Sequence, residues 1–256
     1  MEKNPYRLKK EIEPVLYELV FKPDLKKFSF EVSEVLEFHV LHPLSRIVLH
    51  AADLKVLSAE IFHPGLPGKT LKPLKISLDP KFETVSFTFG QNLKPGKSYR
   101  LSLLLNGVLN DQMHGFYRTS YTARGKKCWG AATQFEATDA RRAFVCVDEP
   151  EAKARFRATL VVPQDLTALS NMPAAKETRD RAAKQKTIHY RTTPVMSTYL
   201  LCFVVADLEV VESRPKKGVP IRVWTTPGKK EQGLFALTAA RHALDYFAKW
   251  FGIPYA

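Results

Sequence analysis

The first half of the chain alternates between apolar and polar positions. From residue 28 to residue 40, apolar side chains fall on one parity and polar side chains on the other. An alternation with period two over this length predicts a half-buried β-strand. Glu34 and Val35 break the alternation, which predicts a bulge or a turn at that point.

Further apolar runs of strand length follow along the chain. They cover residues 15–21, 46–50, 85–89, 99–105, 156–162, 187–191, 199–205 and 221–224. Lys94-Pro95-Gly96 is a turn signal between two of them. Residues 137–144 are compatible with a short helical turn, and the polar stretch 174–186 with a hairpin loop. Many short strands joined by turns predict an all-β, mainly antiparallel fold.

The C-terminal segment changes to helical spacing. Leu234, Leu237, Leu244, Ala248 and Phe251 recur on one face, which predicts a helix over residues 231–251. A Gly-Ile-Pro run after it acts as a stop. One helix after a long series of strands suggests that a second domain begins there, so we expect a β-rich domain over residues 1–211 and a truncated domain over residues 212–256.

Composition limits the class of protein. The 256 residues are 45% hydrophobic and carry a formal charge of +13, and the basic residues are dispersed rather than striped, which favours a solvated surface over a nucleic-acid partner. Three cysteines without C-x-x-C spacing suit reduced thiols. No signal peptide is visible, and the longest apolar run is too short for a bilayer. We therefore expect a cytoplasmic protein that binds neither membrane nor nucleic acid.

Complete catalytic motifs are absent from the sequence. None of the seven histidines belongs to H-E-x-x-H, the arrangement that places two zinc ligands and a general base on one helix. The sequence also lacks the G-x-S-x-G elbow and a glycine-rich phosphate loop. We expect no catalytic residue, no metal ligand and no bound cofactor within this chain.

The block around Gln134 and Glu136 is the most informative part of the sequence. If residues 132–136 are extended, both side chains point to one face while Phe135 points to the other. An amide beside a carboxylate is a good receptor for an ammonium group, because charge-assisted hydrogen bonds are the stronger kind. The alternative is that Glu136 forms an ordinary ion pair with Arg141 or Arg142.

Four motifs in this order resemble one enzyme family. They are G-F-Y-R-T-S-Y from Gly115, T-Q-F-E-A-T-D-A-R-R-A-F-V-C-V-D-E-P from Thr133, S-N-M-P from Ser170 and M-S-T-Y-L from Met196. Together they resemble the aminopeptidase N family of zinc metallopeptidases (gluzincin aminopeptidases). The similarity extends from about residue 10 to the C-terminus, where F-G-I-P-Y also fits the family pattern.

The resemblance implies a fold and a role. It implies a saddle-like, extended β-sandwich followed by the first helix of a thermolysin-like catalytic domain. Glu136 matches the glutamate that binds the free α-ammonium group of a peptide, and Gln134 matches the glutamine that lines the pocket for the first side chain. The other charged residues of the motif match a structural set that holds this loop: Asp139, Arg141, Arg142, Asp148 and Glu149.

The same resemblance implies what the chain lacks. The family's zinc ligands and general base lie beyond residue 256, so Zn²⁺ and the downstream catalytic domain are expected in the full-length enzyme, with a peptide as substrate. Val145, Val147 and Ala256 depart from the family pattern, the first two with a mild effect on packing. Glu136 fits the aminopeptidase branch, because the leukotriene hydrolase branch has glutamine there. The competing hypothesis is a non-catalytic β-domain that acts as a protein-interaction module.

Overall fold

The computed structural model describes residues 6–62, 70–213 and 219–255. Its strands are β1 (Ile12–Asp24), β2 (Ser29–Val40), β3 (Leu44–His50), β4 (Lys55–Phe62), β5 (Thr70–Leu71), β6 (Lys75–Asp79), β7 (Thr84–Leu93), β8 (Ser98–Val108), β9 (Gly115–Ala123), β10 (Lys126–Gln134), β11 (Arg155–Pro163), β12 (Thr167–Ser170), β13 (Ala174–Asp180), β14 (Gln185–Tyr190), β15 (Phe203–Ala206), β16 (Glu209–Ser213) and β17 (Ile221–Thr225). Its helices are the 3₁₀ turns η1 (Ala140–Arg142), η2 (Thr198–Leu200) and η3 (Lys230–Gln232) and the α-helix α1 (Gly233–Phe251).

The chain divides into two compact units. The first comprises Met1–Thr119, Ala131–Gln164 and Ala168–Val205, and the second comprises Ser120–Gly130, Asp165–Thr167 and Ala206–Ala256. The domain boundary expected between residues 211 and 212 stays a prediction.

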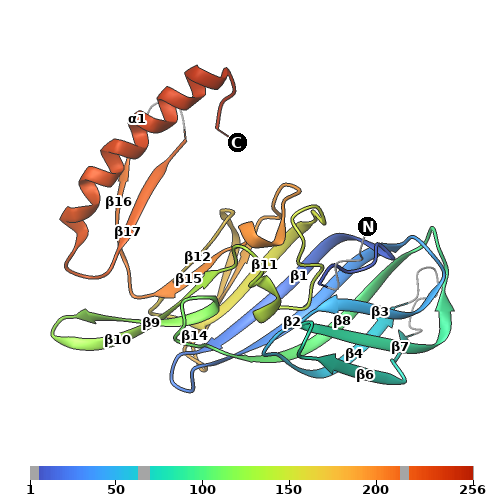
Figure 1. Ribbon diagram of the computed structural model, residues 1–256. Helices are drawn as coiled ribbons and strands as arrows, with labels where there is room; N and C mark the ends of the chain where they lie inside the picture. Colours follow the sequence, from blue (N-terminus) through green and yellow to red (C-terminus); the bar gives the residue numbers. More distant parts are fainter. Residues whose placement is uncertain (1–5, 63–69, 214–218, 256) are drawn as a thin grey trace. The chain divides into compact units, whose positions relative to one another are not determined.

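An eight-stranded sheet forms the centre of the first unit. Its strand order is β13-β14-β11-β1-β2-β8-β4-β5 (Figure 1). All its strand pairs described here are antiparallel except β1 with β11, which run parallel. The prediction of an all-β, mainly antiparallel fold with one C-terminal α-helix is therefore confirmed.

Strand β2 corrects one detail of the sequence prediction. The strand pairs without a register shift at Glu34, on both of its edges, so neither a bulge nor a turn occurs there. Glu34 instead follows the buried parity of Val32 and Leu36 and is itself buried, with 1% of its surface exposed. The break in the alternation marks a carboxyl group inside the core.

A second, three-stranded sheet has the order β3-β7-β6. Ile47, Leu49, Val85 and Phe87 of this sheet are buried, so one of its faces packs into the core. Strand β3 lies at the edge of the sheet and is hydrogen-bonded to β7 on one side. Its other side is bridged at His50 by Cys146.

A third sheet has the order β12-β15-β10-β9. Strands β10 and β15 pair antiparallel, with Ala131 opposite Val205 and Ala132 opposite Val204. Residues 199–205 were predicted as one strand, but residues 198–200 form η2 and the strand β15 begins at Phe203. The predicted hairpin loop 174–186 is instead a hairpin of two paired strands, β13 and β14.

The second unit contains the hairpin β16–β17 and the helix α1, which packs on both strands. The helix predicted over residues 231–251 is confirmed and begins at Gly233 after η3. It ends at Gly252, whose φ of +66° is the left-handed C-terminal conformation that suits glycine. Among the described residues, no helix combines the length and the apolar character that crossing a bilayer requires.

Candidate functional site

The predicted site begins where β10 ends. Gln134 is the last residue of β10 and its side chain is exposed. The next residue, Phe135, is buried and contacts the rings of Phe144 and Phe203 edge-on, with centroids 6.1 and 6.5 Å apart. Such aromatic packing anchors the end of the strand in the core, so the residues on both sides of Phe135 are placed at the surface.

Glu136 lies in the turn that follows. The predicted extended segment 132–136 is wrong in its last part, because β10 stops at Gln134 and Glu136 begins a turn whose first peptide bond, to Ala137, is cis. The Gln134 side-chain amide donates to the Glu136 carbonyl oxygen at 3.3 Å. The Glu136 side chain is exposed. The amide thus holds the backbone of the turn that carries the carboxylate.

Arg141 is a buried cation, and its ion-pair partners are carboxylates other than that of Glu136. Its guanidinium donates to the carboxylate of Asp148 at 3.1 Å and to that of Glu83 at 3.1 Å. Its backbone N–H also donates to Asp148, at 3.2 Å. A buried charge is tolerated when it is paired and hydrogen-bonded in this way.

Arg142 is held by three carboxylates. It donates to Asp139 and Glu83, at 2.8 Å each, and to Asp53. Partial burial acts to lower the pKa of Arg142, but the hydrogen bond to Asp139 and the charges of Glu83 and Asp53 outweigh it and raise the pKa. Within the described residues neither Arg142 nor Arg141 forms an ion pair with Glu136.

Asp148 connects this charged cluster to the neighbouring segments. Its second carboxylate oxygen accepts a hydrogen bond from the Thr198 hydroxyl at 2.7 Å, and its backbone N–H donates to Nδ1 of His50 at 3.0 Å. Burial and the charge of Arg141 lower the pKa of His50. The imidazole is therefore neutral at pH 7 and carries its proton on Nε2, which faces the carbonyl oxygen of Tyr6 at 3.3 Å.

Glu34 supports the same segment from inside the core. Its Oε2 accepts the backbone N–H of Val145 at 3.0 Å, while its Oε1 is buried without a hydrogen-bond partner among the described residues. Burial raises the pKa of Glu34 well above the ordinary value of 4.5, against the lowering effect of the Val145 N–H. Burial thus favours the protonated carboxyl group over the carboxylate at this position.

The four sequence motifs meet around this segment. Gly115 has a φ of +68°, and a Cβ atom there would lie 2.9 Å from the Cβ of Arg142, so the first motif needs glycine at this close approach. Asn171 of the third motif donates to the carbonyl oxygen of Leu200 at 2.7 Å. Ser197 of the fourth motif donates to the carbonyl oxygen of Pro150 at 2.6 Å.

The resemblance implied a structural set of Asp139, Arg141, Arg142, Asp148 and Glu149. The contacts above join the first four, whereas Glu149 accepts the N–H of Leu8 and faces Arg7. The sequence did not indicate the carboxylates that complete the set. Glu83 and Asp53 come from distant segments and carry no local sequence signal, whereas Glu34 was visible as the break in the alternation of β2.

No group of three His, Cys, Asp or Glu side chains suited to a metal ion occurs within residues 6–62, 70–213 and 219–255. The donor set expected for zinc is thus not offered by the described part of this chain.

Comparisons with known proteins agree with the motif pattern. The peptidase M1 N-terminal domain model matches residues 13–200. The chain is 42% identical over 250 residues to "Aminopeptidase M1" of Arabidopsis thaliana, covering 97% of this chain and 28% of the relative. It is 38% identical over 244 residues to the "Puromycin-sensitive aminopeptidase" of Caenorhabditis elegans, covering 95% of this chain and 25% of the relative.

The "Alanine/arginine aminopeptidase" of Saccharomyces cerevisiae is 38% identical over 247 residues, with 95% of this chain and 28% of the relative covered. The chain thus spans between 25% and 28% of the length of these relatives. The family model matches well over half of the chain, and it matches the region that contains Gln134, Glu136 and the charged cluster around them. The chain belongs to the peptidase M1 N-terminal domain family.

Proposed function

We propose that this chain is the substrate-binding N-terminal part of a zinc-dependent aminopeptidase, in which Glu136 receives the free α-ammonium group of a peptide. The observation that supports this role is that the Glu136 carboxylate is not used in an ion pair with another described residue. Glu136 is exposed and has no ion-pair partner among the described residues, although two arginines follow within six positions. Both arginines are occupied by Asp53, Glu83, Asp139 and Asp148.

An unpaired carboxylate on a held turn suits recognition of a cation. Once a bound peptide and a neighbouring domain exclude water, a carboxylate that pairs with a terminal ammonium group discriminates against acetylated or internal peptide bonds, because its charge would then stay unpaired. Gln134 is fixed to the same turn and, in this proposal, lines the pocket for the first side chain. Both residues bind and orient the substrate rather than react with it.

In this proposal, zinc is bound by a part of the protein outside this chain. When bound, zinc in peptidases polarises the scissile carbonyl and activates a water molecule. The described residues of this chain lack a donor set for it, so in this proposal its ligands come from another part of the full-length protein. Residues 134–136 contribute the exopeptidase specificity.

The test is a substitution in the full-length protein. Glu136→Ala is expected to lower kcat/KM for a peptide with a free N-terminus by roughly a hundredfold, the scale of a lost charged contact of about 2–3 kcal/mol. Glu31→Ala, which removes an exposed carboxylate from β2, is the matched control and should change kcat/KM by less than about twofold.

An unchanged kcat/KM for Glu136→Ala would exclude the proposed role of this carboxylate. The comparison with an N-acetylated substrate sharpens the experiment. Because the acetylated substrate cannot pair with Glu136, its slow turnover should be the same in the variant and the parent.

The alternative is a protein-interaction module. The observation in its favour is the helix α1, on which Phe235 and Trp250 are 83% and 69% exposed, an unusual density of large apolar side chains for a surface. The downstream reading frame distinguishes the two hypotheses, because an interaction module needs no zinc-binding motif there.

A further inference from the structure

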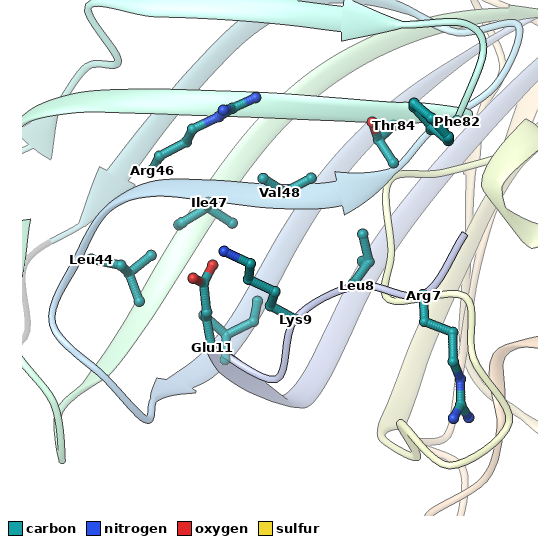
Figure 2. A pocket seen from close by; sticks show the side chains of 11 residues that line it. Arg7, Leu8, Lys9, Glu11, Leu44, Arg46, Ile47, Val48, Phe82 and Thr84 are labelled. Atoms are coloured by element: carbon teal, nitrogen blue, oxygen red, sulfur yellow. The ribbon is translucent and has the colours of Figure 1, made fainter. Parts of the chain in front are cut away.

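A groove on the first unit runs along the free edge of strand β3 (Figure 2). Leu44, Ile47 and Val48 line it from β3, and Leu8 and Lys9 line it from the segment that leads into β1. Its volume is about 330 Å³, within the usual range for ligand sites. The groove is separate from Gln134 and Glu136, neither of which lines it.

The wall opposite β3 is fixed in place. The N–H of Leu8 donates to the Glu149 carboxylate at 2.8 Å, and the carbonyl oxygen of Glu11 accepts the N–H of Leu41 at 2.9 Å. The N–H of Glu11 donates to the carbonyl oxygen of Lys9 at 2.8 Å. The groove therefore has two ordered sides.

The direction of the backbone groups on β3 follows from its bridge to Cys146. The N–H and carbonyl oxygen of His50 both bond to Cys146, at 2.8 and 3.1 Å, so these groups point away from β7. Backbone groups in an antiparallel strand alternate between its two sides every residue. The N–H and carbonyl groups of Val48 and Arg46 therefore point to the same free side as those of His50.

Among the described residues, the chain beyond Cys146 provides no strand partner for these groups. Instead of continuing along β3, the next residue, Val147, donates its N–H to the Tyr17 hydroxyl at 3.2 Å. No backbone hydrogen bond from Arg46 or Val48 to a residue outside the sheet occurs among the described residues. Unpaired edge groups of this kind accept an added strand.

The charges of the groove favour an acidic occupant. Arg7, Lys9 and Arg46 line it together with a single carboxylate, that of Glu11. Arg7 faces Glu149 and Glu151, whereas neither Lys9 nor Arg46 forms an ion pair with another described residue. Arg46 is exposed, so an acidic side chain placed directly opposite it on an added strand would form a favourable cross-strand pair.

We propose that this groove binds an extended acidic peptide segment, which adds to β3 as an antiparallel strand beyond Cys146. Residues opposite Val48 and Arg46 each exchange two backbone hydrogen bonds with β3. The residue opposite Arg46 is acidic. The residue opposite Ile47 is apolar, because its side chain points to the face where Ile47 and Leu44 are buried.

The probe is the blocked tetrapeptide acetyl-Val-Val-Glu-Thr-amide, whose first, second and third residues would lie opposite Val48, Ile47 and Arg46, so that it ends before His50 and its partner Cys146. Amide hydrogen exchange of the purified chain is followed by NMR. In the free protein, the N–H groups of Arg46 and Val48 should exchange at least about tenfold faster than those of Ile47 and Leu49, which bond to β7. Peptide binding should slow Arg46 and Val48 selectively.

Matched peptides separate strand addition from adventitious binding. N-methylation of the first or third residue removes a donor that points to β3 and should abolish the slowing, whereas N-methylation of the second residue should leave it. Arg46→Glu should weaken binding of the acidic peptide by about tenfold and strengthen binding of the same peptide with lysine at the third position.

Two results would overturn the proposal. One is the absence of slower exchange at Arg46 and Val48 at millimolar peptide. The other is equal binding of all three N-methylated peptides, which would mean that the peptide adheres without pairing to β3.

Discussion

Two glutamates of this chain illustrate how surroundings decide what a carboxyl group can do. Glu136 lies on an exposed turn, and in the proposed function its carboxylate pairs with the ammonium group of a peptide. Glu34 is buried on the core face of β2, bonded to the Val145 N–H. The sequence pattern predicted the exposed group from its motif but treated the buried one as a break in a strand, because a charged residue at a core position is rare.

Glu34→Gln should change how stability depends on pH. Burial raises the pKa of Glu34 above 4.5, so the native state holds a proton that the unfolded state releases, and this contribution to stability is lost as the pH rises from about 4.5 to the raised pKa. The variant stays neutral throughout. The free energy of unfolding of the parent minus that of the variant should therefore fall as the pH rises through this range, as measured by urea denaturation.

His50 also titrates differently in the two states, but it does so in both proteins. Its lowered pKa makes the native state lose stability as the pH falls below its ordinary value of 6.5, and this effect cancels in the difference. Glu31→Gln on the exposed face of β2 is the control. A parent–variant difference that is constant with pH would show that the pKa of Glu34 is the same in the native and unfolded states.

At the scale of elements, the alternation with period two predicted β2, and apolar runs predicted eight further strands, because burial along a strand is reflected in the local sequence. These patterns did not predict strands such as β4, β6 and β16, and they could not predict which strands pair. The end of β10 at Gln134 was not predicted either, since Phe135 packs against Phe203, which is remote in sequence, as well as against Phe144. The charged cluster was predicted only in part. Its arginines lie in one motif, whereas Glu83 and Asp53 lie on segments remote from it in the sequence.

Glu83→Ala should loosen the segment from Phe135 to Asp148. Glu83 accepts hydrogen bonds from both Arg141 and Arg142, and its removal leaves the buried Arg141 with Asp148 as its remaining carboxylate. We expect the free energy of unfolding to fall by about 1–3 kcal/mol, measured by urea denaturation of the 256-residue chain.

The conservative change Glu83→Gln keeps an acceptor oxygen and should recover part of this loss. If alanine and glutamine variants were both as stable as the parent, Glu83 would be a solvated surface group with no part in holding the segment. In the full-length protein, we expect Glu83→Ala to raise KM more than it lowers kcat, because the turn that carries Glu136 would be less well positioned.

At the scale of the whole molecule, the fold class and the family could be predicted because motifs and patterns extend along most of the chain. The charge of +13 remains consistent with dispersed surface cations, many of which lie beside acids, as Arg100 and Arg157 lie beside Glu18. The parallel pairing of β1 with β11 could not be predicted from the sequence, because it joins segments as remote as Leu16 and Arg155.

The 256-residue chain by itself is expected to hold no stoichiometric zinc and to show no peptidase activity. The described residues offer no three-ligand group, and the groups that the proposed function assigns to this chain bind the substrate only. Metal analysis of the purified chain and an assay with a free-amino-terminal substrate measure both. Zinc bound at one equivalent, or turnover by the chain alone, would contradict the assignment of catalysis to the rest of the protein.

The ion pairs of the cluster also impose an order on biosynthesis. Arg142 reaches back 89 residues to Asp53 and 59 residues to Glu83, and Arg141 reaches back 58 residues to Glu83. A growing polypeptide must therefore retain both acids in accessible positions until the arginines leave the ribosome, and contacts over such separations close slowly. In the proposed function, a newly made protein would therefore receive a peptide at Glu136 only after this cluster has closed on Asp53 and Glu83.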